Sequence, residues 1–224
     1  KYLESEPDSF TALFGIGVSY QIVDDVDEAI RHYVAALEQN GESAEALTNL
    51  AGLHTKNSAF SDAEKCFRRL VAIEEDNPRA QEGLAYICYR LENLEEARDH
   101  YQRFTALEGD SFEGWYNLGL ITQKLGDHDT ARKAYKRAVE IKSDSIEAHL
   151  NLAACYQEQG DIDDAQKLYE RVLSFDADSL PALYSLAVMH ERNENWDQAV
   201  GYYDKVAEAT SSPEPLFRLG ATLH

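Results

Sequence analysis

Reactive side chains are present in the chain, but their spacing favours no catalytic or metal site. The seven histidines are scattered and form no HxxxH or HExxH pair, the spacing that sets two zinc ligands on one helix face. The segment GIGVSY, residues 15–20, lacks the third glycine of a phosphate-binding loop. Paired carboxylates such as Asp163-Asp164 fall where helix starts are expected, and acids there cap helices. We therefore predict a non-enzyme with no metal and no cofactor.

The charge balance excludes one class of partner. The 224 residues include 21 basic and 41 acidic side chains, a formal net charge of −20. Such a field repels nucleic acid and anionic membranes, since phosphate binding needs clustered Lys and Arg. No apolar run is long enough to span a membrane. We predict no nucleic-acid binding and no membrane insertion; the surplus carboxylates either keep solvated helix faces soluble or attract a basic partner.

The cysteines indicate a cellular compartment, and the first residues indicate whether the sequence is a fragment. Cys66, Cys88 and Cys155 are widely spaced, with no CxxC pair. Free, mostly buried thiols are the default for such a pattern and favour a reducing compartment, so we expect a cytoplasmic location. The sequence opens at KYLESEPDSF without an initiator methionine, which predicts a fragment of a longer protein.

The chain repeats itself every 34 residues. The segment EGWYNLGLITQKLGD, residues 113–127, returns as EAHLNLAACYQEQGD, residues 147–161. Extending this frame gives repeats 10–43, 44–77, 78–111, 112–145, 146–179 and 180–212. Position 20 is alanine and position 24 is aromatic in all six. The two columns are Ala29, Ala63, Ala97, Ala131, Ala165, Ala199 and Tyr33, Phe67, Tyr101, Tyr135, Tyr169, Tyr203.

Each repeat reads as two helices joined by a short break. Apolar residues at positions 4, 7, 8 and 11 have helical spacing, and the second helix carries the alanine and aromatic columns. The break is clearest at Gly126-Asp127 and Gly160-Asp161, where glycine supplies a left-handed residue and aspartate can cap the next helix. Gly or Ala at position 8 and Ala at position 20 should let the two helices approach closely, while the aromatic fills the space toward the next pair.

These columns resemble the tetratricopeptide repeat. The family pattern W-x2-L-G-x2-Y, then A-x3-F, then A, is matched by Trp115, Leu118, Gly119, Ala131, Tyr135 and Ala138. The position-11 tyrosine of the family is kept in only two repeats. The resemblance implies an all-α, right-handed α-solenoid in which residues 1–224 form a single array. Residues 1–9 and 213–224 resemble partial helices of further repeats, so both ends cut through the array.

In this family, first-helix positions 2, 5, 6, 9, 12 and 13 line a concave groove, which implies a set of binding residues here. The set is Phe14, Asn49, Tyr86, Tyr89, Tyr116, Asn117, Leu120, Leu150, Asn151 and Tyr184. An apolar, tyrosine-rich stripe suits an extended peptide or a partner helix. The alternative is that some of these side chains pack between neighbouring first helices.

Two polar columns of the first helices are candidates for ligand contact. Asn49, Asn117 and Asn151 at position 6 resemble the asparagine ladder of O-linked N-acetylglucosamine transferases, which holds peptide backbones, but Gly83 and Ser185 interrupt it. The position-13 cations either meet acidic ligand groups or stabilise the ends of the first helices. These cations are Lys56, Arg90, Lys124 and Arg192. His54 and His190 share a packing column and are expected as core residues.

The function predicted from these features is a non-catalytic scaffold that binds a protein or peptide in the groove. The lysine and asparagine pattern of family members that clamp Hsp70 or Hsp90 tails is missing, since Phe14 and Val18 precede Asn49. Two alternatives stay open. The array could target a larger enzyme, such as a glycosyltransferase, or it could self-assemble through its exposed ends. Those ends carry Tyr2, Leu3, Leu216 and Leu219.

Overall fold

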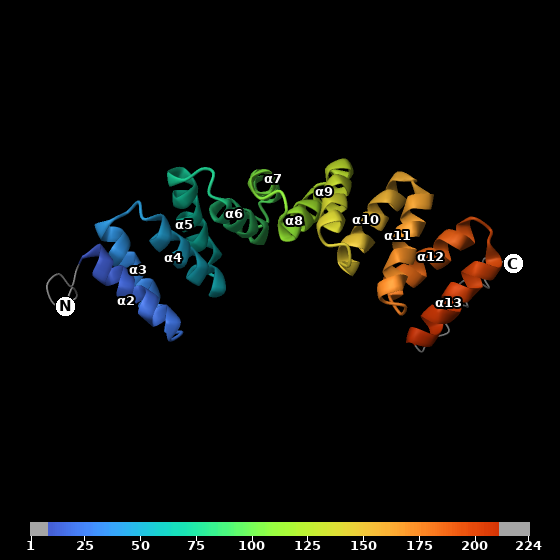
Figure 1. Ribbon diagram of the computed structural model, residues 1–224, viewed down its shortest axis with the longest axis horizontal. Coiled ribbons are helices and arrows are strands. Elements are labelled where there is room, and N and C mark those ends of the chain that lie inside the picture. Colours follow the sequence, from blue (N-terminus) through green and yellow to red (C-terminus); the bar gives the residue numbers. More distant parts are fainter. Residues whose placement is uncertain (1–8, 211–224) are drawn as a thin grey trace. The chain divides into compact units, whose positions relative to one another are not determined.

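The computed structural model describes residues 9–210, and every regular element in that range is an α-helix. The helices follow one another as antiparallel pairs, one pair in each 34-residue repeat (Figure 1). The first helices of the pairs are α2 Phe10–Ile22, α4 Ala44–Lys56, α6 Pro78–Arg90, α8 Phe112–Lys124, α10 Ile146–Gln159 and α12 Leu180–Arg192. The second helices are α3 Val26–Gln39, α5 Phe60–Ile73, α7 Leu94–Leu107, α9 His128–Ile141, α11 Ile162–Phe175 and α13 Trp196–Thr210. The all-α helical-repeat fold predicted from the sequence is confirmed.

A column of small polar residues starts every first helix. The N-cap residues are Ser9, Ser43, Asn77, Ser111, Ser145 and Ser179. The Ser43 hydroxyl accepts a hydrogen bond from the Ala46 amide at 3.3 Å, and the Asn77 side chain accepts one from Ala80 at 3.0 Å. Such a cap satisfies an amide that the helix cannot, and typically contributes about 1 kcal/mol. Five of the six residues form this bond and Ser179 does not, so the caps help to fix the start of five of the first helices.

The break between the two helices also repeats. Gly126 and Gly160 are left-handed, with φ of 78° and 84°, as predicted. The same place in the other four repeats holds Asp24, Ser58, Glu92 and Glu194, also with positive φ. Left-handed geometry at this place is therefore a property of the hairpin rather than of glycine. The following aspartate caps the second helix at Asp25 and Asp127, but not at Asp161.

Small residues set the distance between the paired helices, as the sequence predicted. All six position-20 alanines are fully buried. A Cβ atom on Gly17 would lie 2.9 Å from the Tyr33 ring, and one on Gly119 would lie 2.6 Å from the Tyr135 ring. Both distances are too short for carbon atoms in contact. Glycine at these two positions therefore leaves the space that the aromatic ring of the second helix occupies.

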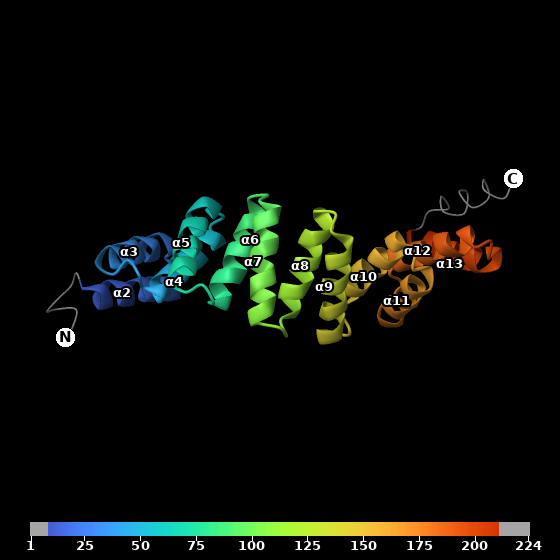
Figure 2. The same ribbon diagram turned by 90° about the horizontal axis from the view of Figure 1, so that it is seen from above.

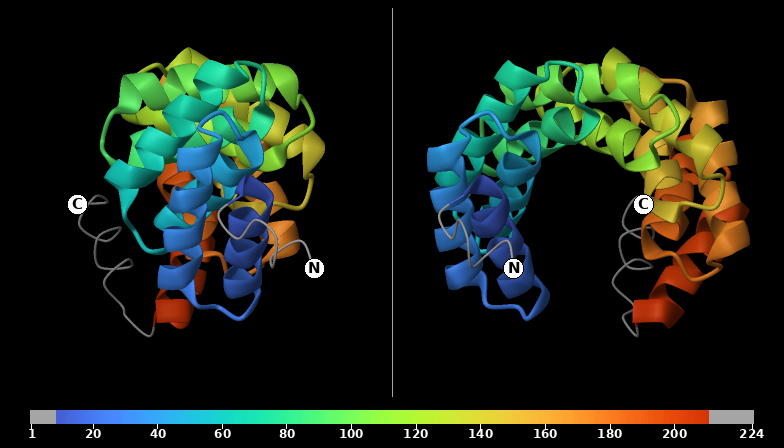
Figure 3. Two further views of the ribbon diagram at one scale, coloured as in Figure 1. Left: turned by 90° about the vertical axis from the view of Figure 1, so that its left-hand side faces the viewer. Right: turned by 60° about the vertical axis from the view of Figure 1, so that its left-hand side comes forward.

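Packing divides the chain into two compact units, residues 1–110 and residues 111–224. The first unit contains α2 to α7 and the second α8 to α13 (Figures 1 and 2). Within each unit the second helix of one pair packs on the first helix of the next, so the three pairs stack in sequence order (Figure 3). That residues 1–224 form one array stays a prediction. The partial helices expected at 1–9 and 213–224 lie outside the described residues, apart from Ser9.

Candidate functional site

The position-5 aromatics lie on the position-24 rings of their own repeats. The ring centroids of Phe14 and Tyr33 are 5.6 Å apart, and those of Tyr116 and Tyr135 are 5.9 Å apart. In the last repeat Tyr184 meets the Tyr203 ring edge-on at 6.1 Å. One side of each position-5 aromatic is thus used in packing. Phe14 and Tyr116 are partly buried, whereas Tyr184 remains 36% exposed.

The position-24 tyrosines make a second repeated contact, which was not predicted. The hydroxyl of Tyr33 donates to Gln21 Oε1 at 2.6 Å, twelve residues upstream. Tyr135, Tyr169 and Tyr203 donate in the same way to the side chains of Gln123, Gln157 and Glu191. Each bond joins the end of the first helix to the middle of the second. The buried hydroxyl is therefore satisfied inside its own hairpin.

Two of the predicted asparagines are hydrogen-bonded to tyrosines. Asn49 Nδ2 donates to the Tyr33 hydroxyl at 3.2 Å, and Asn151 Nδ2 donates to the Tyr116 hydroxyl at 3.3 Å. Burial raises the pKa of Tyr33 and of Tyr116, and the asparagine bond partly opposes this shift. Both asparagines thus join one repeat to the next, which gives this column a packing role that the ladder hypothesis did not include.

The interruption of the asparagine column at Gly83 has a steric cause. The preceding repeat has Phe67 where most repeats have tyrosine, so no hydroxyl is available to an asparagine. A Cβ atom on Gly83 would lie 2.3 Å from the Phe67 ring. The glycine makes room for the ring, and the pair replaces the tyrosine–asparagine contact made by Tyr33 and Asn49.

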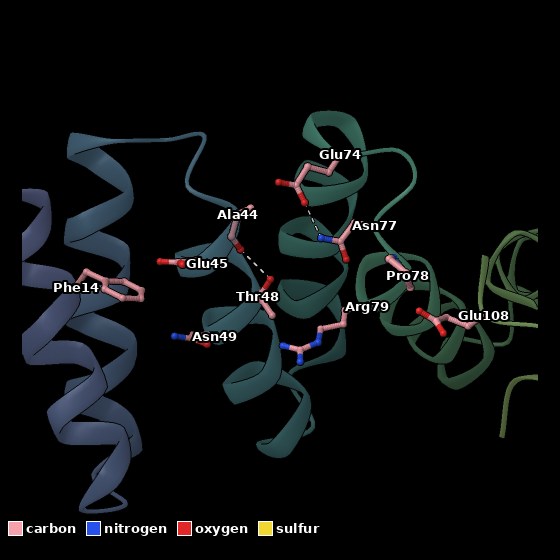
Figure 4. A pocket seen from close by; sticks show the side chains of 10 residues that line it. All are labelled: Phe14, Ala44, Glu45, Thr48, Asn49, Glu74, Asn77, Pro78, Arg79 and Glu108. Atoms are coloured by element: carbon pink, nitrogen blue, oxygen red, sulfur yellow. Dashed lines mark hydrogen bonds between the residues drawn. The ribbon is translucent and has the colours of Figure 1, made fainter. Parts of the chain in front are cut away.

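A groove of about 780 Å³ lies on the first helices of the first unit. Phe14 of α2 points toward Glu45 and Asn49 of α4, and Arg79 of α6 points back toward α4 (Figure 4). The remaining lining residues are Ala44, Thr48, Glu74, Asn77, Pro78 and Glu108. The wall therefore combines one aromatic ring, several amide and hydroxyl groups, and four charged side chains.

Two of the four candidates in the first unit line this groove, namely Phe14 and Asn49. Tyr86 and Tyr89 are partly buried on α6 and are not part of its lining. The Tyr86 hydroxyl accepts a hydrogen bond from Arg90 at 2.6 Å, and the Arg90 guanidinium lies 4.3 Å from the Phe60 ring centroid. Tyr86 is thus part of an aromatic–cation cluster at the end of its helix.

The six candidates of the second unit lie on α8, α10 and α12. Tyr116 and Leu120 pack on the core around Tyr135, and Leu150 packs on the core around Tyr169. Asn117 and Asn151 are half-buried. Tyr184 is the most exposed of the six. Tyr116, Leu120 and Leu150 thus contribute to packing, as the alternative interpretation expected, and a binding role for the six residues stays a prediction.

Four charged residues of the groove were missed. Glu45 and Arg79 occupy position 2, a groove column of the family that was left out of the candidate set. Glu74 and Glu108 follow the second helices, at the C-caps of α5 and α7. The recurrence of glutamate at this place in successive repeats was the available signal. These two glutamates lie outside the first helices, which carry all the groove columns of the family.

The position-13 cations end the first helices. Lys56, Arg90, Lys124 and Arg192 all lie in the last turn, where positive charge complements the helix dipole. Lys56 also pairs with Asp24 of the preceding repeat at 2.6 Å. These contacts support the helix-end interpretation.

No described residues are grouped as a metal site would require. His190 is buried and stacks on Tyr202 with ring centroids 5.5 Å apart, as expected of a core histidine. His54 is partly buried, and burial lowers its pKa. Within residues 9–210 there is also no helix of the length and apolar character needed to cross a membrane.

Consecutive antiparallel helix pairs, closed by small residues and stacked on their neighbours within each unit, define a helical-repeat protein of the solenoid class. Family models agree. Residues 23–82 and 56–111 match models of the tetratricopeptide repeat, and residues 105–215 match the cytochrome c-type biogenesis protein H TPR domain. The chain belongs to the tetratricopeptide-repeat family, whose members are generally non-catalytic interaction scaffolds.

Solved structures show the same fold. A crystal structure of MamA is 26% identical, covers 75% of this chain and 92% of that one, and has a TM-score of 0.70. YrrB, described as a TPR protein with an unusual peptide-binding site, is 22% identical, with coverage of 84% and 97% and a TM-score of 0.75. PilF of Pseudomonas aeruginosa is 17% identical, with coverage of 95% and 97% and a TM-score of 0.66. No curated protein matches the chain.

Proposed function

We propose that the chain is a non-catalytic scaffold that binds an extended peptide in the groove formed by α2, α4 and α6. The observation that carries the proposal is the groove itself, about 780 Å³ in volume, with a partly buried aromatic ring and amide side chains along its wall. Extended peptides need both kinds of group, because side chains seek apolar contact and the peptide backbone seeks donors and acceptors. YrrB, a structural neighbour, is described as having a peptide-binding site, which agrees with this use of the fold.

The face of α8, α10 and α12 is included in the proposal as a second peptide-contacting surface. Its residues are Tyr116, Asn117, Leu120, Leu150, Asn151 and Tyr184. Changing Asn117 and Asn151 to Ala should weaken a peptide that spans this face, because each amide can bond a peptide backbone. An unchanged affinity would remove the asparagines from the site and leave the groove of the first unit as the binding surface.

The cysteines support a reducing, cytoplasmic location as part of the same proposal. Cys66, Cys88 and Cys155 are free and buried. Burial raises the pKa of Cys88 to about 12 and that of Cys155 to about 11. These thiols stay protonated at neutral pH and are poor nucleophiles. They therefore have a packing role, as free cysteines of proteins in reducing compartments commonly do.

The groove can be tested without knowledge of the natural ligand. Peptides are selected from a random dodecapeptide phage library on the wild-type chain, and their affinities are measured by fluorescence anisotropy. Thr48→Trp fills the groove and should abolish binding, whereas Ser61→Trp on the exposed surface of α5 should leave it unchanged. Failure to enrich any peptide, or equal binding by both variants, contradicts the proposal.

A further inference from the structure

The groove of the first unit carries an excess of negative charge. Its lining includes Glu45, Glu74 and Glu108 against a single cation, Arg79. All four of these residues are exposed. Glu74 accepts a hydrogen bond from the Asn77 amide at 2.6 Å, so its carboxylate is held toward the groove wall. Among the described residues, Glu45, Arg79 and Glu108 have no ion-pair partner.

Some charges elsewhere in the same unit are paired across repeats. Arg68 of α5 holds Glu96 of α7 through two bonds of 2.6 and 2.7 Å. Arg103 pairs with Glu75 at 2.9 Å, one repeat earlier. Among the described residues no ion pair neutralises the three groove carboxylates. Glu45 and Glu108 are available to a ligand without the loss of an existing side-chain contact, whereas Glu74 already accepts the bond from Asn77.

We propose that this groove selects peptide segments in which Lys or Arg stands next to an apolar residue; the inference rests on the proposed function. The carboxylates accept hydrogen bonds from an ammonium or guanidinium group, and such charge-assisted bonds are stronger than neutral ones. The Phe14 ring offers a surface for the neighbouring apolar side chain and for the methylene stem of the basic one. An acidic peptide would meet three carboxylates for one guanidinium and is disfavoured. The net charge of −20 adds long-range attraction for the same ligands.

The test compares what the library yields on three proteins. The groove variant is Glu45→Gln, Glu74→Gln, Glu108→Gln, which keeps size and hydrogen-bonding capacity. The matched control is Asp27→Asn, Glu38→Gln, Glu95→Gln, which removes the same charge from exposed positions of α3 and α7 that do not line the groove. Peptides selected on the wild type should be enriched in Lys or Arg beside an apolar residue. They should bind the groove variant about tenfold more weakly, and the control nearly as well as the wild type.

Each outcome separates the inference from the function beneath it. Enriched peptides without a basic residue overturn the inference and leave the peptide-binding proposal standing. An equal loss of affinity in the groove variant and the control also overturns it, because the preference would then come from overall charge. No enrichment on any of the proteins contradicts the proposed function itself, and the inference with it.

Discussion

At the bend of each helix pair the backbone is left-handed, and only two of the six residues there are glycine. Asp24, Ser58, Glu92 and Glu194 have φ between 58° and 64°. A side chain in this conformation brings its Cβ near the carbonyl oxygen, which costs roughly 1–2 kcal/mol. The fold tolerates this cost because the helices on either side are fixed by buried alanines and aromatic rings. The sequence could indicate the bend only where glycine marks it.

We expect Glu92→Gly to stabilise the chain by about 0.5–1 kcal/mol, because glycine adopts positive φ without the Cβ penalty. Glu92 is exposed and its side chain makes no hydrogen bond within the described residues, so little else is lost. Gly126→Ala is the reverse change, and no neighbouring atom would contact its Cβ. It should destabilise by about 1 kcal/mol. Urea denaturation measures both, and effects of the same sign would contradict the explanation.

Gly83 and Gly52 are both helical glycines in the first unit, but their surroundings differ. A Cβ atom on Gly83 would meet the Phe67 ring, whereas one on Gly52 would have no neighbour within 4 Å. Gly83→Ala should therefore destabilise by roughly 1–3 kcal/mol through overpacking. Gly52→Ala should stabilise by about 0.5–1 kcal/mol, the gain in helix propensity. The melting temperatures of the two variants test these signs. Stabilisation by Gly83→Ala would show that the Phe67 ring can move away from the added Cβ atom.

At the scale of the helices, the sequence predicted the columns that keep one residue type and missed contacts whose partner residue varies between repeats. The position-20 alanines and position-24 rings were visible because steric demand fixes one residue type at one place. The Tyr33–Gln21 hydrogen bond was not, since glutamine at position 12 varies between repeats and its partner is defined only by the hairpin geometry. Glu74 and Glu108 follow second helices, which the groove columns of the family omit, and Glu45 occupies a groove column that was left out of the candidate set. Composition alone could not place these carboxylates around one space.

The ion pair between Arg68 of α5 and Glu96 of α7 should make the free energy of unfolding depend on pH. The bidentate contact with Arg68 lowers the pKa of Glu96 below its ordinary value of 4.5. A carboxylate with a lowered folded-state pKa contributes stability above its unfolded pKa and loses it as the pH falls through the folded one. Glu96→Gln should cost up to about 1 kcal/mol at pH 7, since both side chains are partly exposed, and almost nothing in strong acid.

The control for this pair is Glu95→Gln on the same helix. Glu95 is exposed and has no ion-pair partner among the described residues, so its substitution should change stability little at any pH. Urea denaturation of the three proteins at a series of pH values gives the comparison. A destabilisation by Glu96→Gln that persists unchanged in strong acid would assign the effect to packing rather than to the ion pair.

For the whole chain, the excess of acidic residues, 41 against 21 basic ones, determines how the melting temperature responds to salt. Like charges on a folded protein repel one another more strongly than on the expanded unfolded chain, so a net charge of −20 destabilises the compact state. Salt shortens the Debye length from about 30 Å at 0.01 M to about 8 Å at 0.15 M, which screens this repulsion. Salt also weakens the surface ion pairs, but each of these contributes little.

We expect the melting temperature to rise with sodium chloride over this range. The variant Asp27→Asn, Glu38→Gln, Glu95→Gln carries less negative charge and should show a smaller rise by calorimetry. A melting temperature that falls as salt is added would mean that the ion pairs outweigh the repulsion between acidic residues.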